Sequence, residues 1–528
     1  MKKYYSYLYA CSYLAILAAC EPKHNNQSPR AAEVDHPIVK SYKAPYFYND
    51  DRVEKIKALG PQLQKIIEDH ALANDIPGIA FGVVVDNELV LTASTGMINM
   101  DDQLPATAES SFRIASLTKS FTAMSILQLR DEGSLSLLDP VAKYIPDMEG
   151  LEYLTKDSPI VTIENLLTMT SGLPEDNPWG DRQLDESEEM LEDLVAQGLS
   201  MSNVPAYQFE YSNTSYALLG NIISQVSGMP CQTYIQENIL RPLGMDQTYW
   251  EYDNIPKEKL ALGYRREDGQ WKAETLLHDG VFAPIGGLIT SIEDFSKYVS
   301  FQLSAWPPRN DNDTGPLKRS SLREMQRPQF SRLKSNASDF NGLPCPAISG
   351  YGYGLGITED CNNVRRISHG GALPGYGSDY VFFPEYGFGI MAFCNLTYTS
   401  PYPFRKIEKL LFDVIGTNSR KLPVSDILRQ RQKQIVSLIQ DWNPDIEAEI
   451  LAENFYMDFS REHRISKIQD VLIKAGDILD TSILEPENQL RGKFKLEAKN
   501  GEITIFFTLT PENVPKIQQL DLSFMRHM

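Results

Sequence analysis

Ser116 and Lys119 are the first pair in this chain whose types and spacing could do chemistry, because they lie three positions apart at the start of an expected helix. An apolar stripe follows at helical spacing, formed by Phe121, Met124, Leu127 and Leu129. Residues i and i+3 share one helical face, so the serine hydroxyl and the lysine amine should be neighbours. Free backbone N–H groups gather at a helix start. This placement suits a serine nucleophile whose attack on a carbonyl creates an oxyanion.

A Ser-x-x-Lys spacing has little specificity alone, and a second copy, Ser331 to Lys334, lies in a polar stretch without a helical stripe. A serine nucleophile also needs a base, an oxyanion hole and groups that place the substrate. Two further stretches offer them: Tyr211-Ser212-Asn213 just before a helix, and His369-Gly370-Gly371 at the end of a strand. Glycines in that strand would let a substrate backbone lie along its edge.

The elements around these motifs predict an α+β fold. Strands are expected at 79–85, 88–92, 351–357, 364–369, 378–384 and 388–396, and helices at 52–74, 216–229 and 401–415. Helices and loops dominate from about 135 to 300. Because strands lie at both ends of this region with helices between them, we expect one antiparallel sheet flanked by helices, with a helical subdomain.

The composition changes after Gly416. A charged helix is expected at 424–441, and strands at 492–497 and 502–508. We therefore expect residues 424–528 to form a small accessory α+β domain. It contains no constellation to which chemistry can be assigned.

Composition limits the possible partners and cofactors. A chain of 528 residues should hold two or three domains. The net charge of −20 and the absence of a basic run argue against a nucleic-acid partner. None of the seven histidines has a His or Cys partner at zinc-ligand spacing, so we expect no metal, and no cofactor is indicated.

The first residues predict a targeting segment. Lys2 and Lys3 precede a mostly apolar run, 7–19, that is too short to span a membrane. The run ends in Leu-Ala-Ala-Cys20, which resembles the lipobox of a bacterial lipoprotein and implies a signal peptide at 1–19, cleavage before Cys20 and lipid on that residue. The alternative is an ordinary signal peptide cleaved at Ala-x-Ala. Residues 20–50 would form a polar tether, and the protein would be lipid-anchored in the cell envelope, with the outer membrane favoured by Glu21.

Four cysteines remain after that segment, at 231, 345, 361 and 394. An exported compartment permits disulfides. Cys345 and Cys361 bracket a short loop-and-strand segment, and we expect these two to pair.

Taken together, the motifs resemble the serine β-lactamase and penicillin-binding-protein superfamily, in its class C β-lactamase-, DD-peptidase- and esterase-like branch. That branch carries Ser-x-x-Lys, Tyr-x-Asn and Lys-Thr-Gly or His-x-Gly in this chain order. Supporting stretches are 166–174, 285–288 and 353–356, and the resemblance covers about residues 53–415. A second Tyr-x-Asn, Tyr252 to Asn254, has no good helix behind it.

The resemblance implies a role for each residue. Ser116 would be acylated, and Lys119 and Tyr211 would share the transfer of its proton. The backbone N–H groups of Ser116 and Ala372 would form the oxyanion hole. Substrate-binding roles would fall to Asn213, His369, Gly370 and Gly371. The alternatives are a helix N-cap for Asn213 and a structural strand histidine for His369.

Two departures from the β-lactamase pattern lie in the third motif, where His369 replaces lysine and Gly370 replaces threonine. A neutral imidazole and a missing hydroxyl should hold the carboxylate of a β-lactam poorly. A tyrosine phenolate needs cationic neighbours. With one lysine fewer, we expect either a more alkaline rate optimum than a class C β-lactamase has or a larger role for Lys119. A flat profile with its maximum at pH 6 would contradict this.

The sequence thus predicts a lipid-anchored serine hydrolase that cleaves an amide or ester, such as a D-amino-acid peptide, a small ester or a peptidoglycan-derived substrate. One alternative is a non-catalytic wall-binding or sensor lipoprotein, and another is a genuine class C-like β-lactamase. A third is that residues 424–528 set the function by recruiting a partner. The sequence predicts no oligomeric state.

An acidic segment runs from Glu175 to Glu192, in a region that the family places near its cleft. Its eight carboxylates are Glu175, Asp176, Asp181, Asp185, Glu186, Glu188, Glu189 and Glu192. We interpret it as a solvated helix face. Electrostatic steering of cationic substrates is the alternative.

Overall fold

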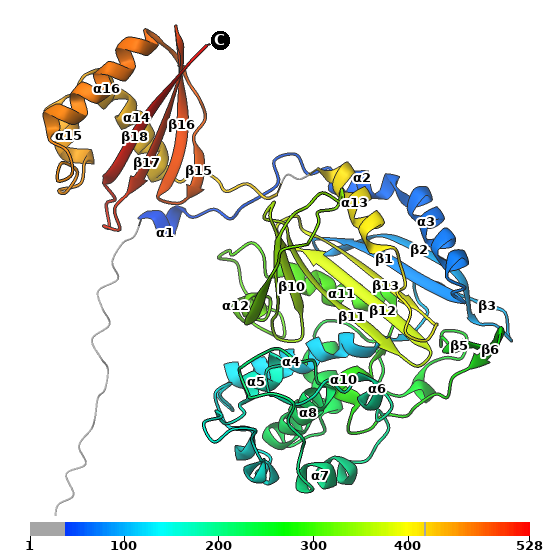
Figure 1. Cartoon of the computed structure of the whole chain (residues 1–528). Helices are drawn as coiled ribbons and strands as arrows, with labels where there is room; N and C mark the ends of the chain where they lie inside the picture. The colour runs from blue at the N-terminus through cyan, green and yellow to red at the C-terminus, as the bar shows by residue number, and fades with distance from the viewer. Residues whose placement is uncertain (1–36, 417–418, 528) are drawn as a thin grey trace, which may run out of the picture. The chain divides into compact units, whose positions relative to one another are not determined.

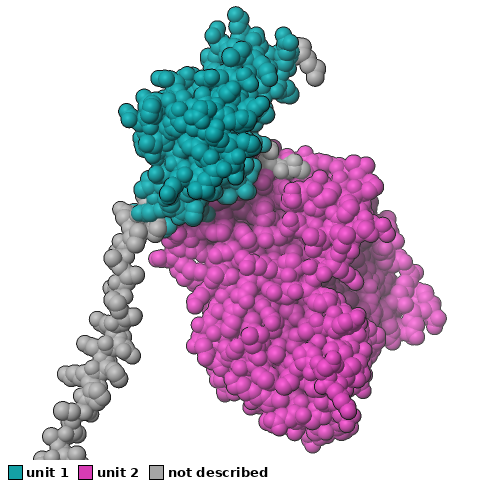
Figure 2. Space-filling view, turned by 60° about the vertical axis from the view of Figure 1, so that its left-hand side comes forward, with its two compact units in different colours: residues 1–42, 424–528 teal, residues 43–423 magenta. Residues whose placement is uncertain are grey.

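The computed structural model describes residues 37–416 and 419–527. The chain divides into two compact units, residues 43–423 and residues 1–42 with 424–528 (Figure 2). The expected signal peptide, the lipid site Cys20 and the expected tether as far as residue 36 lie outside the described residues. The rest of that tether is divided between the units, because a short helix, α1 (Pro37–Ser41), belongs to the unit that holds residues 424–528, whereas Tyr46 pairs with Lys421 in the other.

A nine-stranded antiparallel sheet forms the centre of unit 43–423, in the order β3-β2-β1-β13-β12-β11-β10-β9-β8 (Figure 1). Its strands are β1 (Gly78–Val85), β2 (Glu88–Asn99), β3 (Leu104–Pro105), β8 (Phe330–Lys334), β9 (Ala347–Tyr351), β10 (Gly356–Asp360), β11 (Arg365–Leu373), β12 (Tyr376–Phe383) and β13 (Phe388–Cys394). The central pair joins distant parts of the sequence, with Ile79 opposite Cys394 and Val85 opposite Phe388. The predicted α+β fold is confirmed.

Helices cover both faces of this sheet. Successive side chains of β1 point to opposite faces of the sheet. Ile79, Phe81 and Val83 pack in one core with α2 (Arg52–Ala58), α3 (Gly60–Ala73) and α13 (Phe404–Ile415). Ala80 and Val84 face the opposite core, which contains α11 (Ile292–Ser304). The structure divides the expected helix 52–74 into two helices, α2 and α3, at Leu59.

Two differences from the expected strands have local causes. The predicted strand 351–357 is wrong, because Tyr351 ends β9 and Gly356 begins β10, and between them Gly354 has a φ of +70° that no extended strand allows. Strand β8 was not expected, and it contains the second Ser-x-x-Lys copy. Residues three apart in a strand point to opposite faces, so Ser331 and Lys334 cannot act as a pair.

The helical subdomain lies below the sheet in Figure 1 and supplies the nucleophile. Its helices are α4 (Lys119–Asp131), α5 (Ile163–Leu167), α6 (Asn177–Gly180), α7 (Glu188–Ala196), α8 (Asn213–Ser227), α9 (Cys231–Ile235) and α10 (Ala283–Gly286), and α12 (Arg319–Met325) follows later in the chain. Two small sheets, β4 (Phe112–Arg113) with β7 (Ile289–Thr290) and β5 (Tyr264–Glu267) with β6 (Gln270–Ala273), complete the unit. Helix α8 begins where the Ser212 hydroxyl accepts from Ser215 N–H and ends at Gly228, with a φ of 73°.

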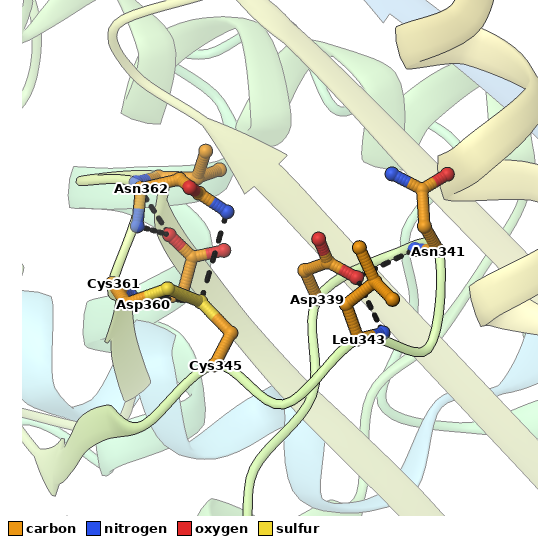
Figure 3. Close-up of a disulfide and its surroundings, with 8 residues drawn as sticks. Asp339, Asn341, Leu343, Cys345, Asp360, Cys361 and Asn362 are labelled. Atoms are coloured by element: carbon orange, nitrogen blue, oxygen red, sulfur yellow. Dashed lines mark hydrogen bonds between the residues drawn. A yellow bond between two sulfur atoms is a disulfide. The ribbon is translucent and has the colours of Figure 1, made fainter.

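The expected disulfide is present, with an S–S distance of 2.07 Å between Cys345 and Cys361 (Figure 3). The turn beside it is organised by Asp360, whose Oδ1 accepts from the backbone N–H groups of Asn362 and Val364 at 2.9 and 3.0 Å. The two other cysteines of the described residues, Cys231 and Cys394, are buried thiols.

Replacing both Cys345 and Cys361 by serine should lower the free energy of unfolding by about 3 kcal/mol, because the bridge closes a loop with a sequence separation of 16. Urea denaturation of the oxidised protein and the double variant checks this. Equal transition midpoints would show that the bridge adds no stability.

The second unit is a small α+β domain. Helices α14 (Asp426–Gln440), α15 (Pro444–Ile450) and α16 (Arg461–Ala475) precede a five-stranded sheet of β14 (Ile478–Thr481), β15 (Glu485–Asn488), β16 (Arg491–Ala498), β17 (Gly501–Leu509) and β18 (Ile517–Arg526). Side chains of β16 alternate strictly between exposed and buried. In the chain as described, 37–416 and 419–527, no helix has both the length and the apolar character needed to cross a bilayer.

Candidate active site

The structure brings Ser116 and Lys119 into direct contact. Ser116 lies in a 3₁₀ turn, 115–118, that leads into α4, and Lys119 is the first residue of that helix. The Nζ atom of Lys119 lies 2.9 Å from Ser116 Oγ and 2.8 Å from the carbonyl oxygen of Ile285. Lys119 is fully buried, whereas Ser116 retains 9% of its exposure. The Ser116 hydroxyl is therefore accessible from solvent, and the Lys119 amine that contacts it is not.

The backbone before Ser116 is strained and held from two strands. Ala115 has a φ of 51°, in the left-handed region that costs a residue with a side chain about 1–2 kcal/mol. The hydroxyl of Ser378 on β12 donates to the carbonyl oxygen of Ile114 at 2.7 Å. Opposite Ser378, Gly371 packs so closely that a Cβ there would lie 2.5 Å from Ile114 O. The neighbouring strands thus fix the position of the nucleophile.

Tyr211 and Asn213 approach this pair from the start of α8. Ser116 is close enough to the Tyr211 hydroxyl to act on its pKa, and Lys119 Nζ lies 5.1 Å from the centre of the Tyr211 ring. Asn213 is fully buried, and its Nδ2 donates to Asn177 Oδ1 at 3.0 Å. Within the described chain, Asn213 Oδ1 has no hydrogen-bond partner. The N-cap alternative for Asn213 is wrong, because Ser212 caps the helix.

Asp176 connects the segment before α6 to the start of α8. Its Oδ1 accepts from the backbone N–H of Asn213 at 2.5 Å, and its Oδ2 accepts from the N–H and hydroxyl of Thr214 at 2.9 and 2.6 Å. A carboxylate at a helix N-terminus is favoured by the free N–H groups and the helix dipole. Two members of the acidic segment are thus drawn into the fold beside the site, the half-buried Asp176 and the buried Asp181, whereas Glu188, Glu189 and Glu192 are exposed on α7 as a solvated face.

His369 is fully engaged by its neighbours. Its Nδ1 lies 2.7 Å from the carbonyl oxygen of Gly370, and its Nε2 lies 3.0 Å from the hydroxyl of Tyr351. A carbonyl only accepts, so Nδ1 carries the proton and Nε2 accepts from Tyr351. Burial, and then the charge of Lys119, lower the pKa of His369 to about 4. The imidazole is therefore neutral at pH 7 and offers a substrate carboxylate no charge.

The acid–base properties of the site single out Lys119. Burial lowers its pKa to about 7, although the carboxylates of Asp181 and Asp176 act in the opposite direction. Burial raises the pKa of Tyr211 far above its ordinary value, and the contact with Ser116 offsets this only in part. Near neutral pH, Lys119 can thus accept a proton while Tyr211 stays a phenol. The expectation of a larger role for Lys119 is supported, and a Tyr211 phenolate is not.

These groups meet at one cavity of about 380 Å³, which we call the Ser116 cavity. Its lining consists of Ser116, Asn177, Asp181, Tyr211, His369, Gly370, Gly371, Ala372, Ser378, Asp379, Tyr398, Thr399 and Ser400. The two residues expected to supply oxyanion N–H groups, Ser116 and Ala372, both line it, whereas Lys119 and Asn213 lie behind its wall. Strand β10 pairs with β11 only as far as Ser368, so His369 to Gly371 leave a strand edge beside the cavity.

Six lining residues were not expected, namely Asn177, Ser378, Asp379, Tyr398, Thr399 and Ser400. Asp181 also lines the cavity, and the sequence had indicated it only as a member of the acidic segment. The second Tyr-x-Asn copy, Tyr252 to Asn254, forms a separate 3₁₀ turn and does not line the cavity. In residues 37–416 and 419–527, no group of three or more His, Cys, Asp or Glu side chains is arranged to hold a metal ion.

Comparison with known proteins gives a consistent result. Residues 63–412 match the family model described as Beta-lactamase. Protein flp of Staphylococcus aureus (strain MW2) is 29% identical over 377 residues, which cover 71% of this chain and 70% of that protein. Beta-lactamase-like protein 2 of Dictyostelium discoideum is 29% identical over 367 residues, 67% of this chain and 63% of that protein.

Two solved structures share the architecture. The octameric penicillin-binding protein homologue from Pyrococcus abyssi has a TM-score of 0.56 at 24% identity, covers 88% of this chain and 98% of its own, and supports the fold alone. The penicillin binding protein from Bacillus halodurans has a TM-score of 0.53 at 26% identity and covers 65% and 99%. Because the family model spans more than half of its length, the chain belongs to the beta-lactamase family, within the serine β-lactamase and penicillin-binding-protein superfamily.

Proposed function

We propose that the protein is a serine hydrolase that cleaves an amide or ester through an acyl-enzyme on Ser116. The observation that carries this proposal is the contact of 2.9 Å between Ser116 Oγ and a buried lysine amine whose pKa is about 7. An amine with such a pKa is a base matched to neutral pH. A non-catalytic sensor would have no need for it.

The reaction would begin with neutral Lys119. Its amine takes the proton of Ser116 while Oγ attacks the substrate carbonyl carbon, and the carbonyl oxygen becomes an oxyanion facing the N–H groups of Ser116 and Ala372. Lys119, with the Tyr211 phenol as relay, returns the proton to the leaving amine or alkoxide when the scissile bond breaks. Water then attacks the acyl-enzyme and gives a proton to Lys119. Lys119 passes this proton to Ser116 Oγ as the acyl C–O bond breaks, which releases the acid and restores the serine hydroxyl and the neutral amine.

The substrate class within this proposal is a D-amino-acid peptide or a small ester rather than a penicillin. His369 is neutral and already holds Tyr351 and Gly370, so it cannot attract the carboxylate of a β-lactam. We propose slow acylation by β-lactams, because the nucleophile is in place. Attachment of the protein to the cell envelope through Cys20 is part of the proposal on the sequence motif alone, and Cys20→Ser should release the protein from the membrane fraction.

The proposal is tested by labelling. The protein from residue 21 is incubated with a fluorophosphonate, a fluorescent penicillin, a chromogenic ester and a D-Ala-D-Ala peptide, and its mass is followed. We expect a covalent adduct with the fluorophosphonate or the ester that is lost in Ser116→Ala. Ser331→Ala is the matched control, because it alters the second Ser-x-x-Lys copy and should label normally. A folded protein whose mass no reagent changes would favour the sensor function.

The pH dependence follows from Lys119. The amine must be neutral to accept the proton. We therefore expect kcat/KM for ester hydrolysis to be constant above about pH 7 and to fall tenfold per pH unit below it, which gives the profile an acidic limb near pH 7. A steady-state profile from pH 5 to pH 10 measures this. A rate that is flat and maximal at pH 6 would contradict the assignment of Lys119 as base.

Asp181→Asn should move that limb to lower pH. The Asp181 carboxylate stabilises the charged amine and raises the pKa of Lys119, so its removal lets the amine deprotonate at a lower pH. The same profile, recorded for the variant, gives the shift. A limb that stays in place would mean that Asp181 does not act on the base.

A further inference from the structure

The Ser116 cavity has a charge pattern that neither the labelling proposal nor the family resemblance uses. Among the described residues that line it, none is lysine or arginine, whereas two carboxylates, Asp181 and Asp379, belong to its wall. The histidine of the wall is neutral, and the buried Lys119 is already in contact with Ser116 and Ile285. A substrate carboxylate would therefore meet repulsion here, so among D-amino-acid peptides those without a free carboxylate beside the scissile bond would fit better.

Asp379 reaches the cavity because of the glycine opposite it. In the pairing of β11 with β12, Gly370 lies directly across from Asp379, and a Cβ on Gly370 would lie 3.9 Å from Asp379 Oδ2. Side chains on directly opposed residues share one face of a sheet. A threonine at 370 would cover this carboxylate, and the glycine leaves it open.

Asp379 has no ion-pair partner among the described residues. Arg366 is the nearest cation, but its guanidinium donates to Glu408 Oε1 at 2.9 and 3.0 Å and to Ser368 Oγ at 2.7 Å. Burial raises the pKa of Asp379 to about 7, with Arg366 opposing and Glu408 adding to the shift. A carboxylate in such a position gains from the arrival of a cation.

Asp181 forms the other acidic part of the wall. It retains only 4% of its exposure, and its Oδ1 accepts from Asn213 Nδ2 at 3.5 Å. Next to it, Asn213 Oδ1 is a buried acceptor without a partner among the described residues. Arg182 is close but does not line the cavity, because it donates to Pro178 O at 2.7 Å and to Tyr398 Oη at 3.2 Å. Burial raises the pKa of Asp181 to about 6, so both carboxylates of the wall would gain charge on the arrival of a cation, and no lysine or arginine among the described residues lines the cavity beside them.

We infer that the Ser116 cavity selects esters or amides that carry a cationic amine within a few atoms of the scissile carbonyl, with Asp181 and Asp379 as the carboxylates that bind it. This rests on the proposed serine hydrolase activity and specifies its substrate class. It also explains what glycine in place of threonine at position 370 would do, since the third motif would then bind a cation where β-lactamases bind an anion.

Matched esters test the inference. The first pair varies the acyl group: 4-nitrophenyl β-alaninate, with an ammonium, against 4-nitrophenyl butyrate, with a methyl group in its place. The second pair varies the leaving group: choline butyrate against 3,3-dimethylbutyl butyrate. We expect kcat/KM, corrected for spontaneous hydrolysis, to favour the cationic member of at least one pair by about tenfold or more. The anionic 4-nitrophenyl hydrogen succinate should be the poorest substrate.

Asp379→Asn and Asp181→Asn should each reduce the cationic preference severalfold. The readout is the ratio of kcat/KM within a pair, so an effect of Asp181 on Lys119 cancels. Asp279→Asn is the matched control, because Asp279 also has a pKa raised to about 6 by burial but contacts Gln232 outside the Ser116 cavity. Its ratio should equal that of the unaltered protein.

The outcomes separate this inference from the proposed function. Ser116-dependent hydrolysis of the neutral esters without a cationic preference, or a preference that neither aspartate variant changes, would overturn the inference and leave the hydrolase intact. Loss of the preference in Asp279→Asn as well would overturn the assignment to Asp181 and Asp379. Absence of Ser116-dependent turnover and of fluorophosphonate labelling would overturn the proposed function and the inference with it.

Discussion

Replacing Lys119 by methionine should slow acylation of Ser116 by about 10³-fold while the protein remains folded. Methionine matches the length and burial of the lysine but cannot accept a proton, and Ser116 Oγ loses its base at 2.9 Å. The cost to folding should be small. Because the pKa of the amine is about 7, it is largely neutral already near that pH, and little of its electrostatic attraction to Asp181 is lost. Single-turnover labelling with a chromogenic ester gives the rate, and thermal unfolding gives the stability.

Lys334→Met is the matched control, since Lys334 stands at the same spacing from Ser331 but on an exposed strand. It should acylate at the unaltered rate. A Lys119→Met protein that is folded and acylates within tenfold of normal would remove Lys119 as the base and return that role to Tyr211.

Gly371→Ala should impair the site strongly, although the substitution adds only one methyl group. A Cβ at this position would lie 2.3 Å from Ser378 Oγ, 2.5 Å from Ile114 O and 3.0 Å from Ala115 Cβ. Two of these contacts are shorter than any real Cβ makes, so β11 must separate from the turn that carries Ser116 and the Ser378 hydrogen bond must break. We expect kcat to fall at least 10²-fold and the protein to lose about 1–3 kcal/mol of stability.

Gly370→Ala provides the comparison for stability. A Cβ there meets only Asp379 Oδ2, at an ordinary 3.9 Å, so the unfolding midpoint should change little. Chemical denaturation of both variants, with labelling of Gly371→Ala by the fluorophosphonate, measures the two effects. Equal midpoints and normal labelling of Gly371→Ala would show that the close packing beside Ile114 is not required.

Motifs with local chemistry could be predicted from the sequence. Ser116 and Lys119 share a helix start, so local spacing predicted that they would be neighbours. Tyr211, which precedes a well-capped helix, was assigned to the same site by the order of the three motifs and the family resemblance. The two ends of the sheet were predictable because buried strands read as continuous apolar runs, as in β1. The break between β9 and β10 at Gly354 could not be predicted, because the alternating Tyr, Gly and Leu residues there do not indicate which glycine has a positive φ.

Features that depend on register or on burial could not be predicted. Asp379 belongs to the site only because β12 pairs with β11 so that it faces Gly370, and a shift by one residue would turn it to the other face. The lowered pKa of Lys119 arises from burial against segments distant in the sequence, such as Ile285. The acidic segment was interpreted as one solvated face, but the fold divides it between that face, the half-buried Asp176 and the buried Asp181.

The pairing of β1 with β13 also determines when this domain can fold. The two central strands come from opposite ends of the unit, with Ile79 opposite Cys394, so the hairpin of β1 and β2 lacks its neighbour until residue 394 has left the ribosome. Closing so long a loop costs entropy before its contacts form, and topologies of this kind fold slowly. The nucleophile, made early in synthesis, therefore acquires its surroundings only when β11, β12 and β13 are complete, and no shorter nascent chain can hold an assembled site.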